Sequence, residues 1–287
     1  MLLQLANSYS PTKNYGVAEW LSSPKLDGVR CLYENPLSGL RSRSGLTRYS
    51  GLGEIEQICE SIRLANNLSF LDGELYIPGE PFDRISGIVR SLRGANAPST
   101  KTTATVVEGK QRVEFRIFAI GFTQYPNIPA ADEYSQVQQI FPAMGKVSYV
   151  PQRLIQNNPL VIQAEADSIK ASGQSAEGIM LRNPNSVYFQ GRSIALLKVK
   201  NFVKDRLLVT GFTKGSGKYS ASLGNLLVSG TLNGRIVNAR VGTGFTDAER
   251  STIWVNQANY MGRIVEVIHL GITATGALRH PVFSAFV

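Results

Sequence analysis

The sequence predicts an α+β domain followed by a small Greek-key β-barrel of the OB type. Through about residue 200, apolar runs rich in β-branched and aromatic residues alternate with segments whose apolar positions recur at helical spacing. From about Asp205 the pattern changes to short strands separated by glycine turns, with one helical segment near residues 247–259. We therefore expect one domain over residues 1–204 and a second over residues 205–287.

Each expected strand of the first domain is an apolar run between turn residues. These runs cover residues 29–33, 70–77, 112–122, 146–150, 177–181 and 195–200. Apolar residues at helical spacing predict helices within residues 52–62, 131–143 and 159–172. The expected strands of the second domain lie within residues 206–212, 224–234, 235–242, 263–272 and 279–283.

The composition excludes several classes of protein. Only Cys31 and Cys59 are present, so no structural zinc site is expected, and both thiols are predicted to be core residues. The two histidines, His269 and His280, give no support to a zinc protease or a Ser/His/Asp hydrolase. The N-terminus lacks the charged and apolar regions of a signal peptide, and no segment is apolar enough to span a membrane, so we expect a cytoplasmic protein.

The charge balance favours a partner that carries phosphates. Thirty Lys+Arg against 21 Asp+Glu give a net charge of +9. Residues 205–287 hold eight Lys+Arg against four Asp+Glu, so both halves of the chain are positive, as a clamp on a nucleic acid requires. Basic residues gather between Arg84 and Arg116, and again in a predicted hairpin loop around Lys214 and Lys218.

One short segment, Ser23-Pro24-Lys25-Leu26-Asp27-Gly28-Val29-Arg30, combines residue types that carry chemistry. A strand-to-turn path would place Lys25 and Asp27 on the same face. A deprotonated lysine amine is a nucleophile, and a nearby acid can hold a metal ion or accept a proton. An ordinary surface ion pair in a turn is the alternative interpretation of this segment alone.

The segment resembles the K-x-D-G-x-R motif of the covalent nucleotidyltransferases, specifically the ATP-dependent DNA ligases. Further segments similar to that family's motifs follow in the family's order. They are Ser42-Arg43-Ser44-Gly45, Asp72-Gly73-Glu74-Leu75, Phe115-Arg116-Ile117-Phe118, Glu177-Gly178-Ile179-Met180-Leu181-Arg182 and Leu197-Lys198-Val199-Lys200. The resemblance spans residues 19–283. It implies an ATP-grasp-like nucleotidyltransferase domain of antiparallel sheets with helices, followed by an OB-fold domain.

The residues of these motifs also suit such a site on physical grounds. Glu74 is expected to follow an Asp-Gly turn, and Glu177 to start a strand, where both carboxylates can bind a hard cation or a ribose. Lys198 and Lys200 share one strand face, where two amines need an anion between them. Phe118 lies in a strongly apolar strand, so core packing is the alternative to a role in stacking on a base.

The resemblance implies an ATP-dependent DNA ligase that seals nicks in double-stranded DNA, in repair, replication or recombination. Lys25 would carry AMP, and its chemistry would be assisted by Asp27, Lys198 and Lys200. The implied nucleotide contacts also include Arg30, Arg43, Glu74, Phe118 and Glu177. Glu177 and Asp27 would hold Mg²⁺, or Mn²⁺ as a substitute. The expected DNA contacts are Arg30, Arg43, Arg90, Arg93, Lys214 and Lys218, and the expected enzyme is a monomer without an obligate protein partner.

One departure from the family pattern leaves a question open. The R-x-P-x-F strand is present as Arg279-His280-Pro281-Val282-Phe283, but the arginine and the Asp-Lys element that follow it in relatives are not found before Val287. We expect another basic residue, such as Arg279 or Lys218, to replace that element; the alternative is that self-adenylylation is weaker than strand sealing from a preformed adenylate. The alternative functions are an RNA ligase, a capping-type nucleotidyltransferase and a non-catalytic nick-binding relative.

Overall fold

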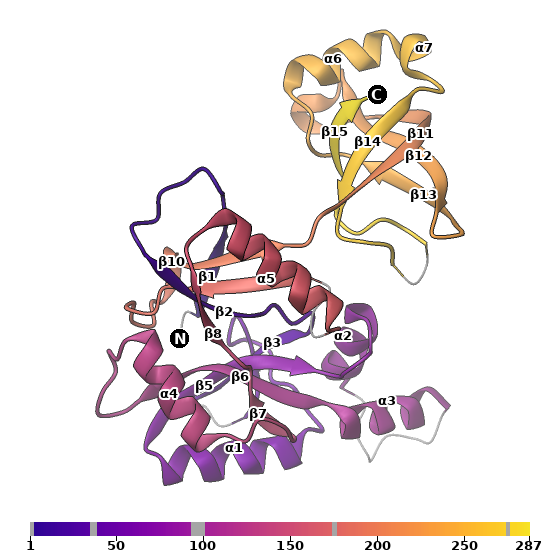
Figure 1. Ribbon diagram of the computed structural model, residues 1–287. Helices are drawn as coiled ribbons and strands as arrows, with labels where there is room; N and C mark the ends of the chain where they lie inside the picture. Colours follow the sequence, from indigo (N-terminus) through magenta and orange to yellow (C-terminus); the bar gives the residue numbers. More distant parts are fainter. Residues whose placement is uncertain (1–2, 35–38, 93–100, 174–176, 274–275) are drawn as a thin grey trace. The chain divides into compact units, whose positions relative to one another are not determined.

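The chain folds into two compact units, Met1–Val199 and Lys200–Val287, in a computed structural model (Figure 1). The structure describes residues 3–34, 39–92, 101–173, 177–273 and 276–287, with the backbone alone for residues 101–103. The units divide between Val199 and Lys200, and the domain boundary at residues 204 and 205 stays a prediction.

Two five-stranded sheets form the first unit. The β2 sheet has the strand order β1-β10-β9-β2-β8, made by Gln4–Ser8, Gly191–Lys200, Gly178–Arg182, Glu19–Pro24 and Arg153–Gln156. The β5 sheet has the order β4-β3-β5-β6-β7, made by Arg41–Ser42, Val29–Glu34, Leu68–Tyr76, Glu114–Phe122 and Val147–Tyr149.

The expectation of antiparallel sheets is wrong at one edge of each sheet. Strand β1 pairs with β10, and β6 pairs with β7, in parallel. Parallel neighbours need a crossover connection rather than a hairpin. Helix α4 (Ala130–Ile140) lies in the connection from β6 to β7, and most of the first unit separates β1 from β10.

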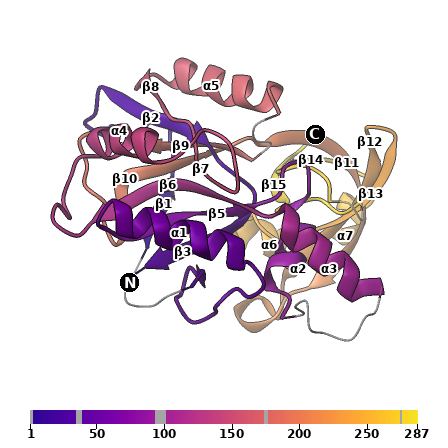
Figure 2. The same ribbon diagram turned by 90° about the horizontal axis from the view of Figure 1, so that it is seen from below.

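Helices cover the outer faces of the two sheets, and the sheets face each other between them (Figure 2). Helix α5 (Pro159–Ala171) packs Ile162, Ala166 and Ile169 on the β2 sheet. Helix α1 (Gly53–Ala65) packs on the β5 sheet, together with α4 and α2 (Phe82–Arg90). Helix α3 (Lys101–Arg112) follows α2. Because strand side chains alternate between faces, the residues between those that pack on the helices point to the inner faces.

Gly73 lies in the middle of β5, so the Asp-Gly turn expected before Glu74 is wrong. A Cβ atom at Gly73 would lie 2.3 Å from the carbonyl oxygen of Arg116 on β6. The register of the β5–β6 pair also shifts between Asp72 and Gly73. The glycine therefore allows a close approach of two strands instead of a turn, which is the other common reason for glycine in a strand.

The second unit is a five-stranded antiparallel sheet of the order β13-β12-β11-β14-β15. Its strands are Arg235–Val241, Leu223–Leu232, Val203–Lys214, Ile264–His269 and Val282–Phe286. A single bridge between Thr243 and Val282 joins the segment after β13 to β15. Helix α6 (Asp247–Val255) starts with a capping box between Thr246 and Glu249, and the short α7 (Gln257–Tyr260) follows it.

Most predicted elements are confirmed, and several were missed. The expected strands of both units and the helices α1, α4, α5 and α6 are present. The sequence patterns did not predict β1, β2, β4, β8, α2 or α3. Cys31 and Cys59 are both fully buried, as expected. None of the helices in the described part of the chain is long and apolar enough to cross a membrane.

Candidate active site

A pocket of about 230 Å³ lies within the first unit, between the inner faces of the two sheets. On β9 and β10 the lining residues alternate, as Met180 and Arg182 and as Leu196 and Lys198 do, which is the period of two expected for a strand face. The β2 sheet and the segment after β2 contribute Ser23, Pro24, Lys25, Leu26, Met180, Arg182, Leu196 and Lys198, and the β5 sheet contributes Arg30, Glu74, Phe118 and Ala119. Six lining residues are Lys or Arg, and Glu74 is the lining acid, so the pocket suits a phosphate-bearing ligand.

Lys25 follows directly after β2, at the rim of the β2 sheet. Its backbone N–H donates to the carbonyl oxygen of Gly178 at 2.9 Å, which continues the pairing of β2 with β9. Its ammonium group forms an ion pair with Glu177, whose side chain is about 10% exposed. The structure thus brings together a lysine and a glutamate that are far apart in the sequence, with the lysine facing the pocket.

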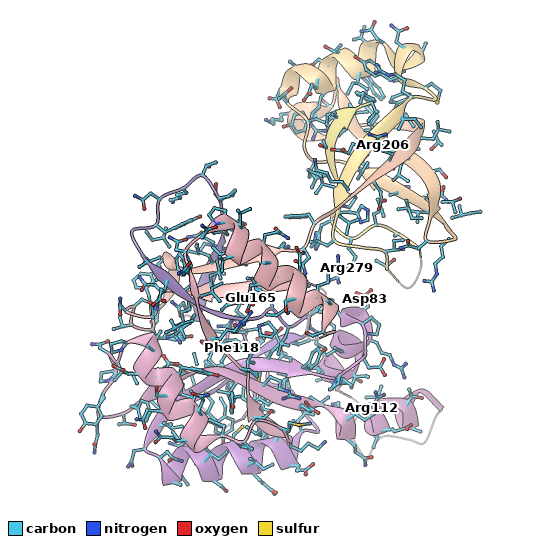
Figure 3. All side chains as sticks on the ribbon, viewed as in Figure 1. Asp83, Arg112, Phe118, Glu165, Arg206 and Arg279 are labelled. Carbon is cyan, nitrogen blue, oxygen red and sulfur yellow. The ribbon has the colours of Figure 1, made fainter. Side chains whose placement is uncertain are left out.

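Arg30 and Phe118 form the opposite side of the pocket. Arg30 Nε and Nη2 donate to the two carboxylate oxygens of Asp72 at 2.7 and 2.6 Å. The guanidinium carbon lies 4.3 Å from the centre of the Phe118 ring. Burial is the largest single influence on Arg30 and lowers its pKa, but the charge and hydrogen bonds of Asp72, together with Tyr188 and Glu74, outweigh burial and raise that pKa above its ordinary value. Phe118, labelled in Figure 3, therefore lines a pocket instead of packing in a core cluster.

Glu74 lies on β5 beside these cations. Burial raises the pKa of its carboxyl from 4.5 to about 7, although the charges of Arg30 and Lys25 oppose that shift. The charges of Asp72 and Asp27 add to it. At neutral pH the carboxyl therefore exists in both protonation states and can accept or donate a hydrogen bond to a hydroxyl group.

Asp27 and Gly28 complete the turn after Lys25. A Cβ atom at Gly28 would lie 2.4 Å from the carbonyl oxygen of Leu75 and 2.7 Å from Glu74 Cγ, so this motif glycine brings the two strands together. Asp27 is half-buried, and its charge acts on Glu74, but it is not part of the pocket lining.

The other expected nucleotide contacts divide into two sets. Arg43, exposed in the turn after β4, and Lys198 on β10 both line the pocket. Lys200, two residues beyond Lys198 on the same strand, belongs to the second unit and is not in the lining.

The expected DNA-binding residues outside the pocket lie on separate elements. Arg90 is exposed at the end of α2, and Arg93 lies outside the described residues. Lys214 is exposed at the end of β11. Lys218 lies in a short 3₁₀ turn, where its ammonium group is 3.3 Å from Asp247 of α6.

Four lining residues with side-chain contacts were not singled out from the sequence. Arg182 ends the predicted motif on β9 and donates to the buried Glu133 of α4 at 2.6 Å. Arg192 donates to the carbonyl oxygen of Ala6. Tyr188 and Gln152 also line the pocket. A basic residue ending a strand motif could have identified Arg182, but no local pattern reveals its partner 49 residues away.

The acids of the site suit a hydrated Mg²⁺ ion better than a metal cage. No group of three His, Cys, Asp or Glu side chains that could hold a metal occurs among the described residues. Mg²⁺ usually keeps several waters and binds one or two carboxylates together with substrate phosphates. Glu177 and Asp27, on either side of the Lys25 segment, are donors of that kind.

Comparison with known proteins agrees with this architecture. Residues 214–286 match the family model of the DNA ligase OB-like domain. A DNA ligase of Haemophilus influenzae is 23% identical over 296 residues, covering 96% of this chain and 89% of that protein. A solved structure from a study of DNA binding by Lig E DNA ligases is 27% identical with a TM-score of 0.71, covering 100% of this chain and 99% of that one. The ATP-dependent DNA ligase of bacteriophage T7, solved in complex with ATP, is 19% identical with a TM-score of 0.54 and covers 99% and 98%.

The chain thus combines a lysine that faces a cationic pocket in its first unit with a match to the DNA ligase OB-like domain in its second unit. Over its whole length the chain resembles DNA ligases, including the Haemophilus influenzae enzyme and the Lig E structure.

Proposed function

We propose that the chain joins 5′-phosphate and 3′-hydroxyl ends at nicks in duplex DNA, through AMP carried on Lys25. The observation that carries this proposal is the Lys25–Glu177 ion pair at the rim of a pocket that also contains Phe118 and Arg30. The pocket offers an aromatic surface for the base, a carboxyl for the ribose and cations for the phosphates.

In the first step the Lys25 amine, after losing its proton, attacks the α-phosphate of ATP. A P–N bond forms, the bond to the β-phosphate oxygen breaks, and pyrophosphate leaves. Glu177 forms an ion pair with the Lys25 ammonium group and takes up the proton. Arg30 and Lys198 stabilise the negative charge that develops on the phosphoryl oxygens, and Lys200 follows on the same strand.

In the second step a 5′-phosphate oxygen of the nick attacks the AMP phosphorus and frees Lys25. In the third, the 3′-hydroxyl attacks the adenylylated 5′-phosphate and AMP leaves. Arg43 and Arg30, which line the pocket, contact the phosphates in these steps. Glu74 and Phe118 hold the ribose and the adenine throughout. A bound Mg²⁺, with Mn²⁺ as a substitute, would neutralise charge on the phosphates, with Glu177 and Asp27 as its protein ligands.

Several finer assignments belong to the same proposal. Residues 205–287 act as a domain that grips the DNA backbone, with Lys214 and Lys218 contacting phosphates, and Arg90 and Arg93 extend the contacts of the first domain. Arg279 or Lys218 assists departure of pyrophosphate. The enzyme works as a cytoplasmic monomer without an obligate protein partner. The net charge of +9, positive in both halves, supports the DNA contacts.

The test is sealing of a labelled nicked duplex with ATP and Mg²⁺, with Lys25→Ala as the control. We expect sealing by the natural chain only, and a mass increase of one AMP on the peptide that carries Lys25. Equal sealing by Lys25→Ala would overturn the proposal. Labelling with GTP instead of ATP would indicate a capping-type enzyme, and preference for a nicked RNA would indicate an RNA ligase. Nick binding without any lysine adduct would indicate a non-catalytic relative.

A further inference from the structure

Tyr188 turns inward from an exposed segment between β9 and β10. Its neighbours Val187 and Phe189 are 39% and 50% exposed, whereas Tyr188 is half-buried and its ring lies 4.8 Å from that of Phe70. The Tyr188 hydroxyl donates to Asp72 Oδ2 at 2.6 Å and accepts the backbone N–H of Gln4 at 3.1 Å. The Tyr188 hydroxyl is thus fixed by one hydrogen bond that it donates and one that it accepts.

Asp72 is the acceptor on which this contact acts. Its side chain is fully buried, and a buried carboxylate requires several donors to remain charged. It receives three donors, namely Tyr188 Oη, Arg30 Nε and Arg30 Nη2, at 2.6, 2.7 and 2.6 Å. Tyr188 and Arg30 Nη2 share the oxygen Oδ2. The Tyr188 hydroxyl therefore fixes the orientation of the Asp72 carboxylate. That orientation in turn determines how the Arg30 guanidinium must lie to form both of its hydrogen bonds to Asp72.

The contacts of Arg30 leave one group for a ligand. A guanidinium has five N–H donors. Nε and Nη2 donate to Asp72, and Nη2 also lies 3.3 Å from the carbonyl oxygen of Gln4. In the described part of the chain Nη1 makes no hydrogen bond, and Arg30 lines the pocket. The Asp72 carboxylate and the Phe118 ring thus set the direction in which Nη1 points.

We propose that Tyr188 is a positioning residue of the enzyme, which acts through Asp72 to aim Arg30 Nη1 at a phosphate in the pocket. This inference rests on the proposed function, in which Arg30 stabilises phosphoryl oxygens. Without the hydroxyl, the arginine is the only side-chain donor to Asp72 among the residues that the structure describes, so the carboxylate and the guanidinium can rotate together. The arginine then keeps its charge and its ion pair but loses its fixed direction.

The first test compares two tyrosine-to-phenylalanine variants. Tyr33→Phe is the matched control, because Tyr33 lies on the same strand as Arg30 and donates to a carboxylate, Glu60, at 2.9 Å on the outer face of the sheet. We expect similar small decreases in Tm for both variants. Single-turnover sealing should fall about tenfold in Tyr188→Phe and by less than about twofold in Tyr33→Phe. Equal sealing by the two variants would overturn the inference.

A double-mutant cycle separates positioning from a general loss of structure. Arg30→Lys keeps the charge but cannot form the two-pronged contact with Asp72. In that background Tyr188→Phe should change the rate of sealing by less than about twofold, because the lysine has no guanidinium for Asp72 to orient. A full tenfold effect in both backgrounds would show that Tyr188 acts independently of Arg30, and would contradict the inference.

The same cycle can be measured without turnover, as affinity for a non-hydrolysable ATP analogue by calorimetry. This measurement decides the matter even when Arg30→Lys seals too slowly to follow. We expect Tyr188→Phe to weaken binding only where Arg30 is present, and an equal weakening in both backgrounds would count against the inference. Failure of the natural chain to form an adduct on Lys25 would instead refute the proposed function. An adduct together with additive effects would refute only the role of Tyr188.

Discussion

Arg30 and Glu74 lie directly opposite each other in the β3–β5 ladder, yet the Arg30 guanidinium donates two hydrogen bonds to Asp72 instead of to Glu74. A cross-strand pair of opposite charges ordinarily forms an ion pair. Here Arg30 forms its ion pair with Asp72, two residues earlier on β5. Among the described residues, the Glu74 side chain has no hydrogen bond or ion pair. Burial without a direct partner raises the pKa of Glu74 to about 7.

The raised pKa of Glu74 predicts a pH-dependent stability of the ligand-free enzyme. A carboxyl whose folded-state pKa exceeds its ordinary value of 4.5 binds its proton more tightly in the folded state. The stability that this tighter proton binding gives to the folded enzyme is therefore fully present below pH 4.5 and is lost as the pH rises through 7. Glu74→Gln should unfold like the natural chain at pH 5, and at pH 8 should be more stable by on the order of 2 kcal/mol in urea titrations.

Glu60→Gln provides a control with the opposite sign. The hydrogen bond from Arg63 lowers the pKa of Glu60, so its contribution to stability is present above the ordinary pKa and is lost as the pH falls. This variant should be less stable than the natural chain at pH 8, and the difference should shrink toward low pH. A Glu74→Gln variant that is less stable than the natural chain at pH 8 would contradict the prediction. It would show that the charged Glu74 carboxylate is stabilised in the folded enzyme.

The close approach of β5 and β6 predicts that Gly73→Ala destabilises the first unit. The added Cβ would lie 2.3 Å from the Arg116 carbonyl oxygen and 2.8 Å from the Phe115 ring, and neither the backbone nor a fully buried ring can move away cheaply. We expect a loss of about 2 to 4 kcal/mol in urea unfolding. Gly53→Ala at the start of α1 is the control, because nothing lies within 4 Å of its added Cβ, and it should be neutral. A Gly73→Ala chain as stable as Gly53→Ala would contradict the observed strand spacing.

The sequence was informative where one strand or one motif carried the feature. Lys25, Arg30 and Lys198 were singled out from motif segments and Phe118 from the family resemblance, and all four line one pocket. Alternation within a strand predicts which residues share a face. Gly73 was misinterpreted because glycine permits a turn and also a close approach of strands, and the sequence does not distinguish them.

Contacts between segments that are distant in sequence could not be predicted. Glu133 is buried and accepts hydrogen bonds from Arg182 and from the Ile120 N–H, so it joins α4 to both sheets. Nothing in the helical pattern of α4 distinguishes this inward-facing acid from an ordinary surface glutamate. The contacts of Tyr188 with Asp72 and of Gln4 with Arg30 are also between distant segments. The parallel pairing of β1 with β10 brings Gln4 to the pocket, and no local pattern predicts that pairing.

The ring of Phe118 predicts a defect in nucleotide affinity that excess ATP can overcome. If the base stacks on this ring, Phe118→Ala removes about 1 to 3 kcal/mol of binding, which corresponds to a weakening of roughly 5- to 150-fold. Formation of the Lys25 adduct should therefore show a raised KM for ATP and a nearly unchanged rate at saturation. Phe118→Tyr, which keeps an aromatic face, should stay close to the natural chain. A lower saturating rate with an unchanged KM would instead assign the ring to alignment of Arg30, which it contacts at 4.3 Å.

The exposed Lys214 at the end of β11 predicts a change in the salt dependence of DNA binding. Each phosphate contact contributes about 0.9 to the slope of log affinity against log salt concentration. Lys214→Ala should reduce that slope by about one on a nicked duplex, with equal loss for different sequences around the nick. Lys204→Ala is the matched control, because Lys204 lies on the same strand but is paired with Glu266 at 3.0 Å. If both variants keep the slope of the natural chain, β11 does not contact the DNA backbone through Lys214.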